Sequence, residues 1–235
     1  MKKPHTASFS ALDAYDQCPL KDYLTNILKK KSPKPRKYTK ELKLGNDAHG
    51  LIEKFFKGEI KLNVVSRKLG PGWVPRFRDL ASRYVDKQKN TVHGIEKFAS
   101  WPILKGEYTF WARIDYWFLA KGHLTIIDWK TGKLEYAKQE QLQWNILATC
   151  ETFGLKPRTV EAMFIGLKPL DEWTDHEDTL ISTGKIPARP LLAEAKREIR
   201  KRAMLRWRDE KREPKEGWSC SFCDWNGTGH CPLKP

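Results

Sequence analysis

Two carboxylates and a lysine are the residues of this chain whose types and spacing are best suited to chemistry. Asp128 and Lys130 lie two positions apart in the run Ile-Ile-Asp-Trp-Lys-Thr-Gly at residues 126–132. In a β-strand, residues i and i+2 point to the same face, so these side chains would project side by side. Asp115 precedes them in the tripeptide Arg-Ile-Asp. We predict that the three side chains converge on one site.

A short turn between two predicted strands would bring the two carboxylates together. The strands are predicted at 113–119 and 124–129, and Ala-Lys-Gly-His joins them. A hairpin of this length places Asp115 opposite Asp128. Carboxylates within apolar strands cost desolvation free energy unless they bind a metal ion or a cation. The alternative is a pair of unrelated surface salt bridges, since a lone Asp-x-Lys tripeptide often occurs by chance.

Metal-assisted hydrolysis of a phosphodiester is the chemistry that such a site favours. Mg²⁺ and Mn²⁺ prefer oxygen ligands in near-octahedral geometry. Asp115 and Asp128 would supply carboxylate ligands, and the backbone carbonyl of Trp129 would supply another. A bound ion lowers the pKa of a water molecule and holds phosphate oxygens. Lys130 would orient the attacking water or stabilise the charge that develops on the phosphate.

The charge balance of the chain favours a polyanionic partner. The 235 residues include 44 Lys and Arg against 29 Asp and Glu, for a formal net charge of +15. The stretches at 29–43 and 196–208 are especially basic and are candidates for contact with phosphates. We find no apolar run of 18 residues, signal peptide or lipidation motif, which argues against a membrane partner.

The order of predicted elements indicates a mixed α/β fold around a small sheet. Helices are predicted at 8–28 (interrupted at Cys18-Pro19), 42–56, 74–87, 139–152 and 190–212. Strands are predicted at 104–111, 113–119, 124–129 and 158–166.

The cysteines form a second informative pattern, and they are Cys18, Cys150, Cys220, Cys223 and Cys231. Their odd number and the absence of a secretion signal favour a reduced intracellular protein. The last three lie close together in a tail with little apolar content, which needs a staple to be ordered. With a fourth thiol, for which Cys18 is the natural candidate, they would hold Zn²⁺ or an iron–sulfur cluster. Cys150 is interpreted as a small buried apolar residue, and His230 is a less favoured alternative ligand.

The motifs together resemble a known family. Glu107, Arg-Ile-Asp115, the run containing Asp128 and Lys130, and Gln141-Leu142 are similar to motifs of the PD-(D/E)XK nuclease superfamily. The resemblance is greatest to its RecB-like branch, which includes the CRISPR-associated and AddB-type iron–sulfur nucleases. It implies a restriction-endonuclease-like core, with a central mixed β-sheet flanked by helices. It also implies a single nuclease domain over 1–235, with its core at about 40–215.

The resemblance implies further site residues. A histidine on an early helix reaches the metal in the RecB-like branch, and His49 matches it, although a lone helical histidine is usually structural. An acid near the metal matches Glu107, which is the weakest of these assignments. A helical glutamine that approaches the DNA or the active site matches Gln141. The tyrosine that accompanies this glutamine in the family is replaced by Asn145.

The resemblance also implies an assignment for the thiols. In the iron–sulfur nucleases, one N-terminal cysteine joins three near the C-terminus in a cluster that encloses the nuclease domain. Cys18 together with residues 218–235 would form this staple around a 4Fe–4S cluster, with Cys18, Cys220, Cys223 and Cys231 as ligands. Seven residues separate Cys223 from Cys231, a longer gap than is usual in that family, so Zn²⁺ remains the alternative.

The expected function is therefore that of a metal-dependent DNA nuclease, an exonuclease on single-stranded or end-bearing DNA. It would act in DNA recombination, repair, phage DNA processing or CRISPR adaptation, in the cytoplasm of a bacterial, archaeal or phage-infected cell. A helicase, recombinase or integrase is the expected protein partner. The alternatives are a non-catalytic DNA-binding module with a structural cysteine cluster, and a zinc-ribbon interaction protein, which would leave the strand acids unexplained.

Overall fold

The computed structural model describes residues 2–33, 40–84, 91–132, 134, 137–167 and 180–233. The chain folds into two compact units. The smaller unit consists of Met1–Lys37, Ser100–Ala112 and Lys196–Pro235, and the larger of Tyr38–Ala99 and Arg113–Ala195. The expectation of a single nuclease domain over 1–235 stays a prediction. Within the basic stretch at 29–43, residues 34–39 lie outside the described part.

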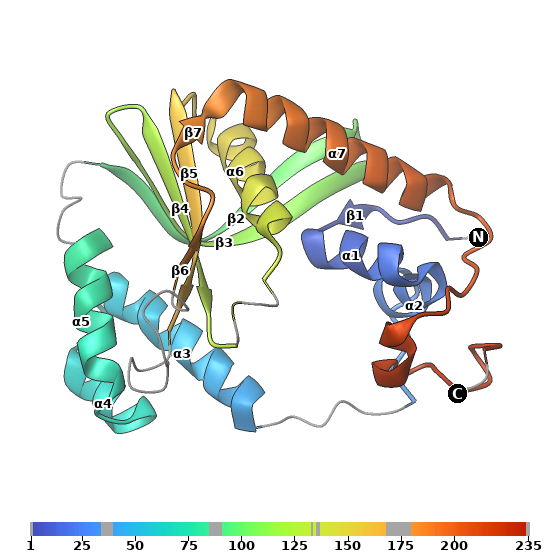
Figure 1. The fold of residues 1–235 in the computed structure, drawn as a ribbon, viewed down its shortest axis with the longest axis horizontal. Helices are drawn as coiled ribbons and strands as arrows, with labels where there is room; N and C mark the ends of the chain where they lie inside the picture. Colours follow the sequence, from blue (N-terminus) through green and yellow to red (C-terminus); the bar gives the residue numbers. More distant parts are fainter. Residues whose placement is uncertain are drawn as a thin grey trace. The chain divides into compact units, whose positions relative to one another are not determined.

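A mixed β-sheet forms the centre of the larger unit (Figure 1). Its strands are β2 (Val92–Leu104), β3 (Tyr108–Ala120), β4 (His123–Lys130), β5 (Thr159–Gly166), β6 (Leu180–Ser182) and β7 (Ile186–Pro187). β4 pairs antiparallel with β3 and parallel with β5, and β5 also pairs antiparallel with β6 and β7. β2 pairs with β3, and the first parts of β3 and the last part of β2 belong to the smaller unit. The predicted mixed sheet is therefore confirmed.

The hairpin between β3 and β4 has the register that the sequence predicts. Its turn residues Lys121 and Gly122 have φ values of 48° and 76°. Two consecutive residues with positive φ are typical of the type I′ turn, whose twist matches that of the flanking strands. The register runs from Ala120 opposite His123 to Tyr116 opposite Ile127. One further step along this register places Asp115 opposite Asp128, on one face of the sheet.

Helices cover both faces of this sheet (Figure 1). They are α3 (Lys40–Phe56), α4 (Leu62–Leu69), α5 (Trp73–Tyr84) and α6 (Gln139–Phe153). One apolar core joins α3, α4 and α5 to the sheet, and in it the ring of Phe56 packs edge-on against Tyr116 and Trp129. α6 lies against β4 and β5 on the other side. Of the helix predicted at 74–87, residues 85–87 lie outside the described part.

The helix predicted at 8–28 is interrupted at Cys18, as expected for a residue that precedes proline. In the smaller unit, α1 (Phe9–Gln17) is followed by α2 (Pro19–Asp22) and a π-helical turn (Tyr23–Ile27). Ser8 caps α1 by accepting a hydrogen bond from the Ala11 backbone. The short strand β1 (Thr6–Ala7) pairs in parallel with β3.

A buried ion pair joins the elements of the smaller unit. Arg206, on α7 (Ala188–Arg208), donates to both carboxylate oxygens of Asp22, and the two side chains are 1% and 0% exposed. Its remaining nitrogen donates to the Thr6 carbonyl at 2.8 Å and to the Tyr108 hydroxyl at 3.0 Å. Because every oxygen of the carboxylate is engaged, the cost of burying these charges is largely offset.

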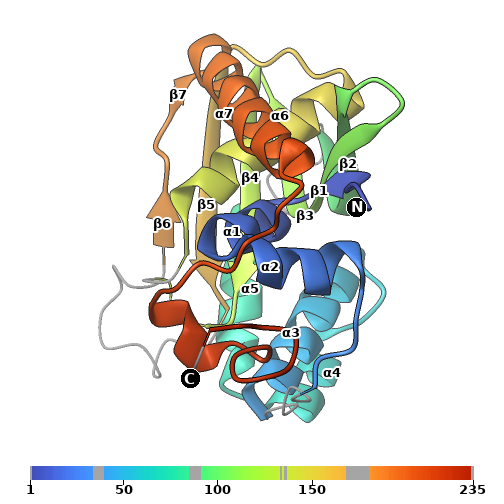
Figure 2. The same ribbon diagram turned by 90° about the vertical axis from the view of Figure 1, so that its right-hand side faces the viewer.

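The C-terminal tail is attached to the same unit (Figure 2). It contains a 3₁₀ helix at Trp218–Phe222. The Trp225 indole donates to Thr25 Oγ1 at 3.0 Å, and Lys215 donates to the Asp16 carbonyl at 3.0 Å. The tail is therefore bonded to α1 and to the π-helical turn, on either side of Cys18 in the sequence.

None of the helices in the described part of the chain is long and apolar enough to cross a membrane.

Candidate active site

Asp128 has a partner at each of its two carboxylate oxygens. It lies near the end of β4 and is 6% exposed. Its Oδ1 lies 2.6 Å from Lys130 Nζ, and its Oδ2 accepts a hydrogen bond of 3.0 Å from Gln141 Nε2, in the first turn of α6. The Lys130 ammonium also lies 4.7 Å from the centre of the Phe164 ring. The structure thus brings Asp128, Lys130 and Gln141 together.

Asp115 and His49 form a second group beside the backbone of Trp129. The Trp129 backbone N–H donates to Asp115 Oδ2 at 2.8 Å. His49 Nδ1 lies 3.6 Å from the same oxygen. Since Asp115 and Asp128 interact electrostatically, the two groups form one site.

Glu96 joins this site, and the sequence analysis missed it. Ligand atoms of His49, Glu96 and Asp115 all lie within 4.8 Å of one another, and no other such trio occurs among the described residues. Glu96 has a φ of 48° inside β2, a conformation that L-residues rarely adopt. Such kinks re-aim side chains next to active sites. Arg113 pairs with the Glu96 carboxylate from the neighbouring strand.

The prediction that Glu107 lies in a strand is wrong. Glu107 occupies the turn between β2 and β3, where its side chain is exposed. Its backbone N–H bonds to the Leu104 carbonyl at 3.1 Å, which closes the turn. The glutamate that the structure places beside His49 and Asp115 is Glu96. No signal in the sequence marks it, because a local φ inversion breaks the two-residue alternation on which strand prediction depends.

The buried acids resist ionisation. Burial and the neighbouring carboxylates of Asp128 and Glu96 raise the pKa of Asp115 well above its usual range. Burial also raises the pKa of Asp128, although the Lys130 ammonium opposes this shift. Burial raises the pKa of Glu96, and Arg113 opposes it. A bound cation would relieve this crowding of negative charge, so the donor set fits a divalent metal ion.

His49 is neutral at physiological pH. Burial, followed by the positive charges of Lys130 and Arg113, lowers its pKa to about 4. A neutral imidazole has a lone pair that is available to a metal ion, whereas a protonated ring has none. The protonation state of His49 therefore suits the role of a ligand.

A close helix–strand contact positions His49. Gly45 lies one turn before His49 on α3, and a Cβ at Gly45 would stand 2.7 Å from Thr131 Oγ1. Thr131 directly follows Lys130 at the end of β4. A side chain at Gly45 would therefore push α3 away from β4, or displace Thr131.

The four predicted cluster cysteines all belong to the smaller unit. Cys18 is buried at the junction of α1 and α2, whereas Cys220, Cys223 and Cys231 are partly exposed, and all are free thiols. No three sulfur atoms of the described cysteines lie within 4.8 Å of one another.

A match to a family model identifies the superfamily of this chain. The model for the PD-(D/E)XK nuclease superfamily matches residues 6–228. The chain belongs to the PD-(D/E)XK nuclease superfamily. No curated protein matches this superfamily member. It is similar to a crystal structure of SSO0001, with 13% sequence identity and a TM-score of 0.41 over 96% of this chain and 86% of that one.

Membership of the PD-(D/E)XK superfamily implies a nuclease with DNA as its substrate. Nucleases of this superfamily use divalent metals such as Mg²⁺ or Mn²⁺, and the acidic trio described above is a candidate site for one. The RecB-like branch, the iron–sulfur cluster and the exonuclease mode stay predictions.

Proposed function

We propose that this protein is a metal-dependent deoxyribonuclease whose Mg²⁺ or Mn²⁺ is held by His49, Glu96 and Asp115, with Asp128 and the Trp129 carbonyl beside them. The proposal rests on one observation, which is that two groups of polar side chains lie together in the larger unit. His49, Glu96 and Asp115 present their ligand atoms within 4.8 Å, and Asp128 stands beside them, paired with Lys130. A superfamily match over most of the chain supports the same assignment.

Each residue of the site has its own role in hydrolysis. When bound, the metal ion would polarise the phosphate and lower the pKa of the attacking water. Lys130 orients that water or stabilises the charge that develops on the phosphate, because its ammonium pairs with Asp128 beside the metal-binding trio. Gln141 holds the other oxygen of Asp128 and so fixes its orientation. Neutral His49 completes the donor set.

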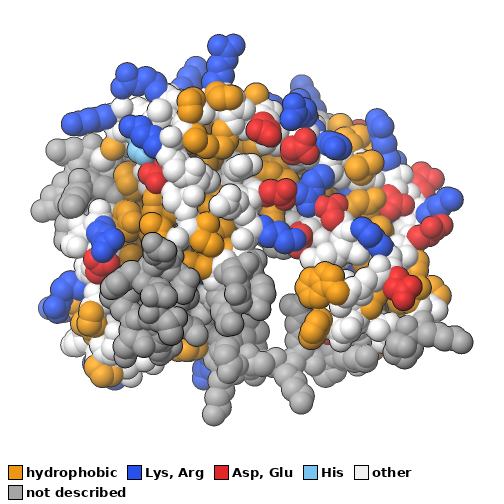
Figure 3. Space-filling model, in the orientation of Figure 1, with side chains coloured by type: hydrophobic (Ala, Val, Ile, Leu, Met, Phe, Trp, Pro, Cys, Tyr) orange, Lys and Arg blue, Asp and Glu red, His pale blue; other side chains and the backbone are white. Residues whose placement is uncertain are grey.

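The finer assignment is a RecB-like exonuclease on single-stranded or end-bearing DNA. It rests on the motif resemblance and on the net charge of +15, which favours a polyanion. Figure 3 shows Lys and Arg side chains along the margin where α7 runs in Figure 1. Arg200, Lys201 and Arg208 of this helix are exposed. Recombination, repair, phage DNA processing or CRISPR adaptation in the cytoplasm, with a helicase, recombinase or integrase, is the corresponding cellular role.

Cleavage of end-labelled linear and covalently closed DNA, each single- and double-stranded, tests this proposal. The protein is purified anaerobically and assayed with Mn²⁺, with Mg²⁺ and with a chelator. Metal-dependent cleavage that Asp128→Asn abolishes is expected, and resistance of closed circles would identify an exonuclease. A folded wild-type protein that binds DNA but cleaves none of these substrates would instead be a non-catalytic DNA-binding module.

We also propose that Cys18, Cys220, Cys223 and Cys231 hold a 4Fe–4S cluster that staples the tail to the N-terminal helices. The support is that all four are free thiols of one compact unit, whose tail is already bonded to the segments around Cys18. Iron, sulfide and zinc analysis of anaerobically purified protein tests it. We expect four irons and four sulfides per chain in the wild type, and we expect the Cys220→Ser variant to lose them. One zinc and no iron would favour the zinc alternative.

A further inference from the structure

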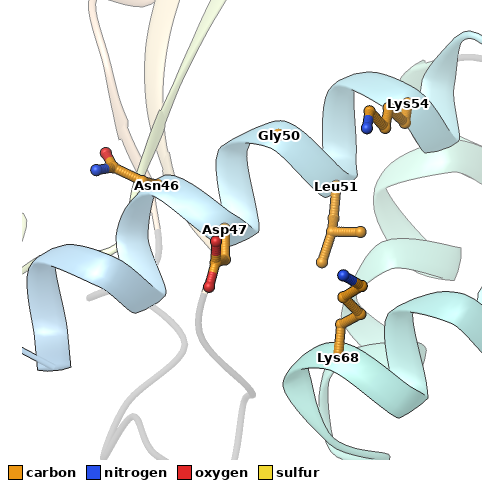
Figure 4. Close-up of a pocket in the computed structure, with 6 residues that line it drawn as sticks. All are labelled: Asn46, Asp47, Gly50, Leu51, Lys54 and Lys68. Carbon is orange, nitrogen blue, oxygen red and sulfur yellow. The ribbon is translucent and has the colours of Figure 1, made fainter.

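A basic hollow lies on α3 and α4 of the larger unit, apart from the metal-site side chains. It has a volume of about 210 Å³ and is lined by Asn46, Asp47, Gly50, Leu51, Lys54 and Lys68. Figure 4 shows the side chains of Lys54 and Lys68 reaching from the two helices toward the space beside Leu51. This volume is below that of typical small-molecule pockets, so the hollow suits a small group that belongs to a longer ligand.

Gly50 keeps the hollow open. A Cβ at this position would have no atom within 4 Å, so the described structure has no packing reason for a glycine here. A glycine inside a helix destabilises it relative to alanine. Its backbone is therefore accessible to a ligand that approaches α3 closely.

The charges of the hollow favour an anion. Within the described part of the chain, no carboxylate is within ion-pair distance of Lys54 or Lys68, whereas Lys57 on the same helix pairs with Glu53. Two lysines and one aspartate leave a formal charge of +1 on the lining. Asp47 lies two turns away from Lys54 along α3, so the two lysines define a cationic end. One phosphodiester, with a single negative charge, matches this lining.

The hollow is also fixed relative to the metal site. His49 and Gly50 are consecutive on α3, and Lys54 lies five residues after His49, about 7.5 Å along the helix axis. The same five-residue step turns through about 140° around α3, so Lys54 leaves the helix on a different side from His49. A strand with one phosphate in the hollow would therefore pass around α3 before another of its linkages reaches the metal site.

We propose that the hollow over Gly50 binds one non-scissile phosphate of the DNA strand through Lys54 and Lys68. This inference rests on the proposed function, which it deepens by naming a backbone subsite. The subsite reads no base, because its contacts are to the phosphate alone.

DNA binding without divalent metal separates the subsite from catalysis. Fluorescence anisotropy of a labelled single-stranded oligonucleotide in chelator compares the wild type with Lys54→Gln/Lys68→Gln. The matched control is Lys57→Gln/Lys185→Gln, which removes the same charge from exposed positions of the same unit outside the hollow. We expect the hollow variant to bind roughly 10-fold more weakly, with a salt dependence lower by about one unit. The control should change affinity by less than about 2-fold.

A methylphosphonate scan locates the phosphate. Oligonucleotides that each carry one uncharged methylphosphonate linkage are bound to both proteins. In the wild type, one non-scissile linkage should weaken binding most, and the hollow variant should be insensitive at that linkage. A penalty of equal size in the variant, or a variant that binds as tightly as the control, overturns the subsite. Failure of the folded wild type to bind any DNA would instead overturn the proposed function itself.

Discussion

Lys130 Nζ lies 2.6 Å from Asp128 Oδ1, and the two side chains leave the same face of β4. The pair results from a two-residue spacing on one strand, so no other element is needed to form it. The neighbouring elements restrain the positions of both side chains. Gln141 on α6 holds the second carboxylate oxygen, and the Phe164 ring on β5 faces the ammonium.

Replacement of Lys130 by methionine should lower the cleavage rate by about 10²–10³-fold, because the charge opposite the developing phosphate anion is lost. Methionine keeps most of the aliphatic side chain, so the fold should persist. Single-turnover cleavage and circular dichroism measure the two effects. Lys138→Met, at the N-cap of α6, is the control, and equal losses in both variants would contradict a specific role.

Asp115→Asn should stabilise the metal-free protein at high pH. The raised pKa of Asp115 means that the folded state binds this proton more tightly than the unfolded state, so wild-type stability falls as pH rises above about 3.9. Asparagine has no such loss and can still accept from the Trp129 N–H. At pH 8, the melting temperature of the variant should exceed that of the wild type by about 2–4 °C for each kcal/mol of destabilisation that the substitution removes.

The same variant should lose its response to metal. Added Mn²⁺ binds the native wild type and raises its melting temperature by mass action. A variant that gains as much as the wild type from Mn²⁺ would show that Asp115 is not a ligand, and one whose advantage does not shrink as pH falls would show that the pKa of Asp115 is not raised.

Glu96 and Glu107 provide a direct test of the ligand set. Glu96→Gln should weaken Mn²⁺ binding by about 10–100-fold, the range seen when groups that hold or orient metal ligands are removed. Glu107→Gln should leave binding unchanged, since its side chain is exposed in a turn. Isothermal titration of both variants with Mn²⁺ measures the difference. The opposite ranking would restore Glu107 to the site and remove Glu96 from it.

Substitution by alanine should have different effects on stability at two glycines of α3. Gly50→Ala should raise the free energy of unfolding by about 0.5–1 kcal/mol, because its Cβ meets open space in a helix. Gly45→Ala places a Cβ against Thr131 Oγ1, which offsets this gain and weakens Mn²⁺ binding by displacing His49. Chemical denaturation and metal titration measure both effects. Identical behaviour of the two variants would mean that the Gly45–Thr131 contact does not position α3.

Arg206→Met should lower the free energy of unfolding by about 3–5 kcal/mol, since it leaves the Asp22 carboxylate buried without its partner. Arg208→Met, on the exposed face of the same helix, is the control and should change it by less than about 0.5 kcal/mol. Urea denaturation of the two variants makes the comparison. A small effect of Arg206→Met would indicate that water reaches Asp22.

The sequence allowed prediction of those features that depend on residues close together in the chain. Strand alternation and the turn at Lys121-Gly122 are local, so the β3–β4 hairpin and its register were predictable. The interruption at Cys18-Pro19 was predictable for the same reason, because proline acts on its immediate neighbours. Gln141 was inferred only from a motif, and its bond to Asp128 joins residues of two elements.

Residue spacing was enough to predict that Asp128 and Lys130 share a face and that Asp115 lies opposite Asp128, and composition was enough to give the net charge of +15. The presence of Glu96, and not Glu107, beside His49 and Asp115 could be seen only in the folded chain. The physical reason is that this choice depends on a positive φ in β2 and on the close approach of α3 that Gly45 permits. Both are set by packing between segments far apart in the chain, which no local pattern of residues records.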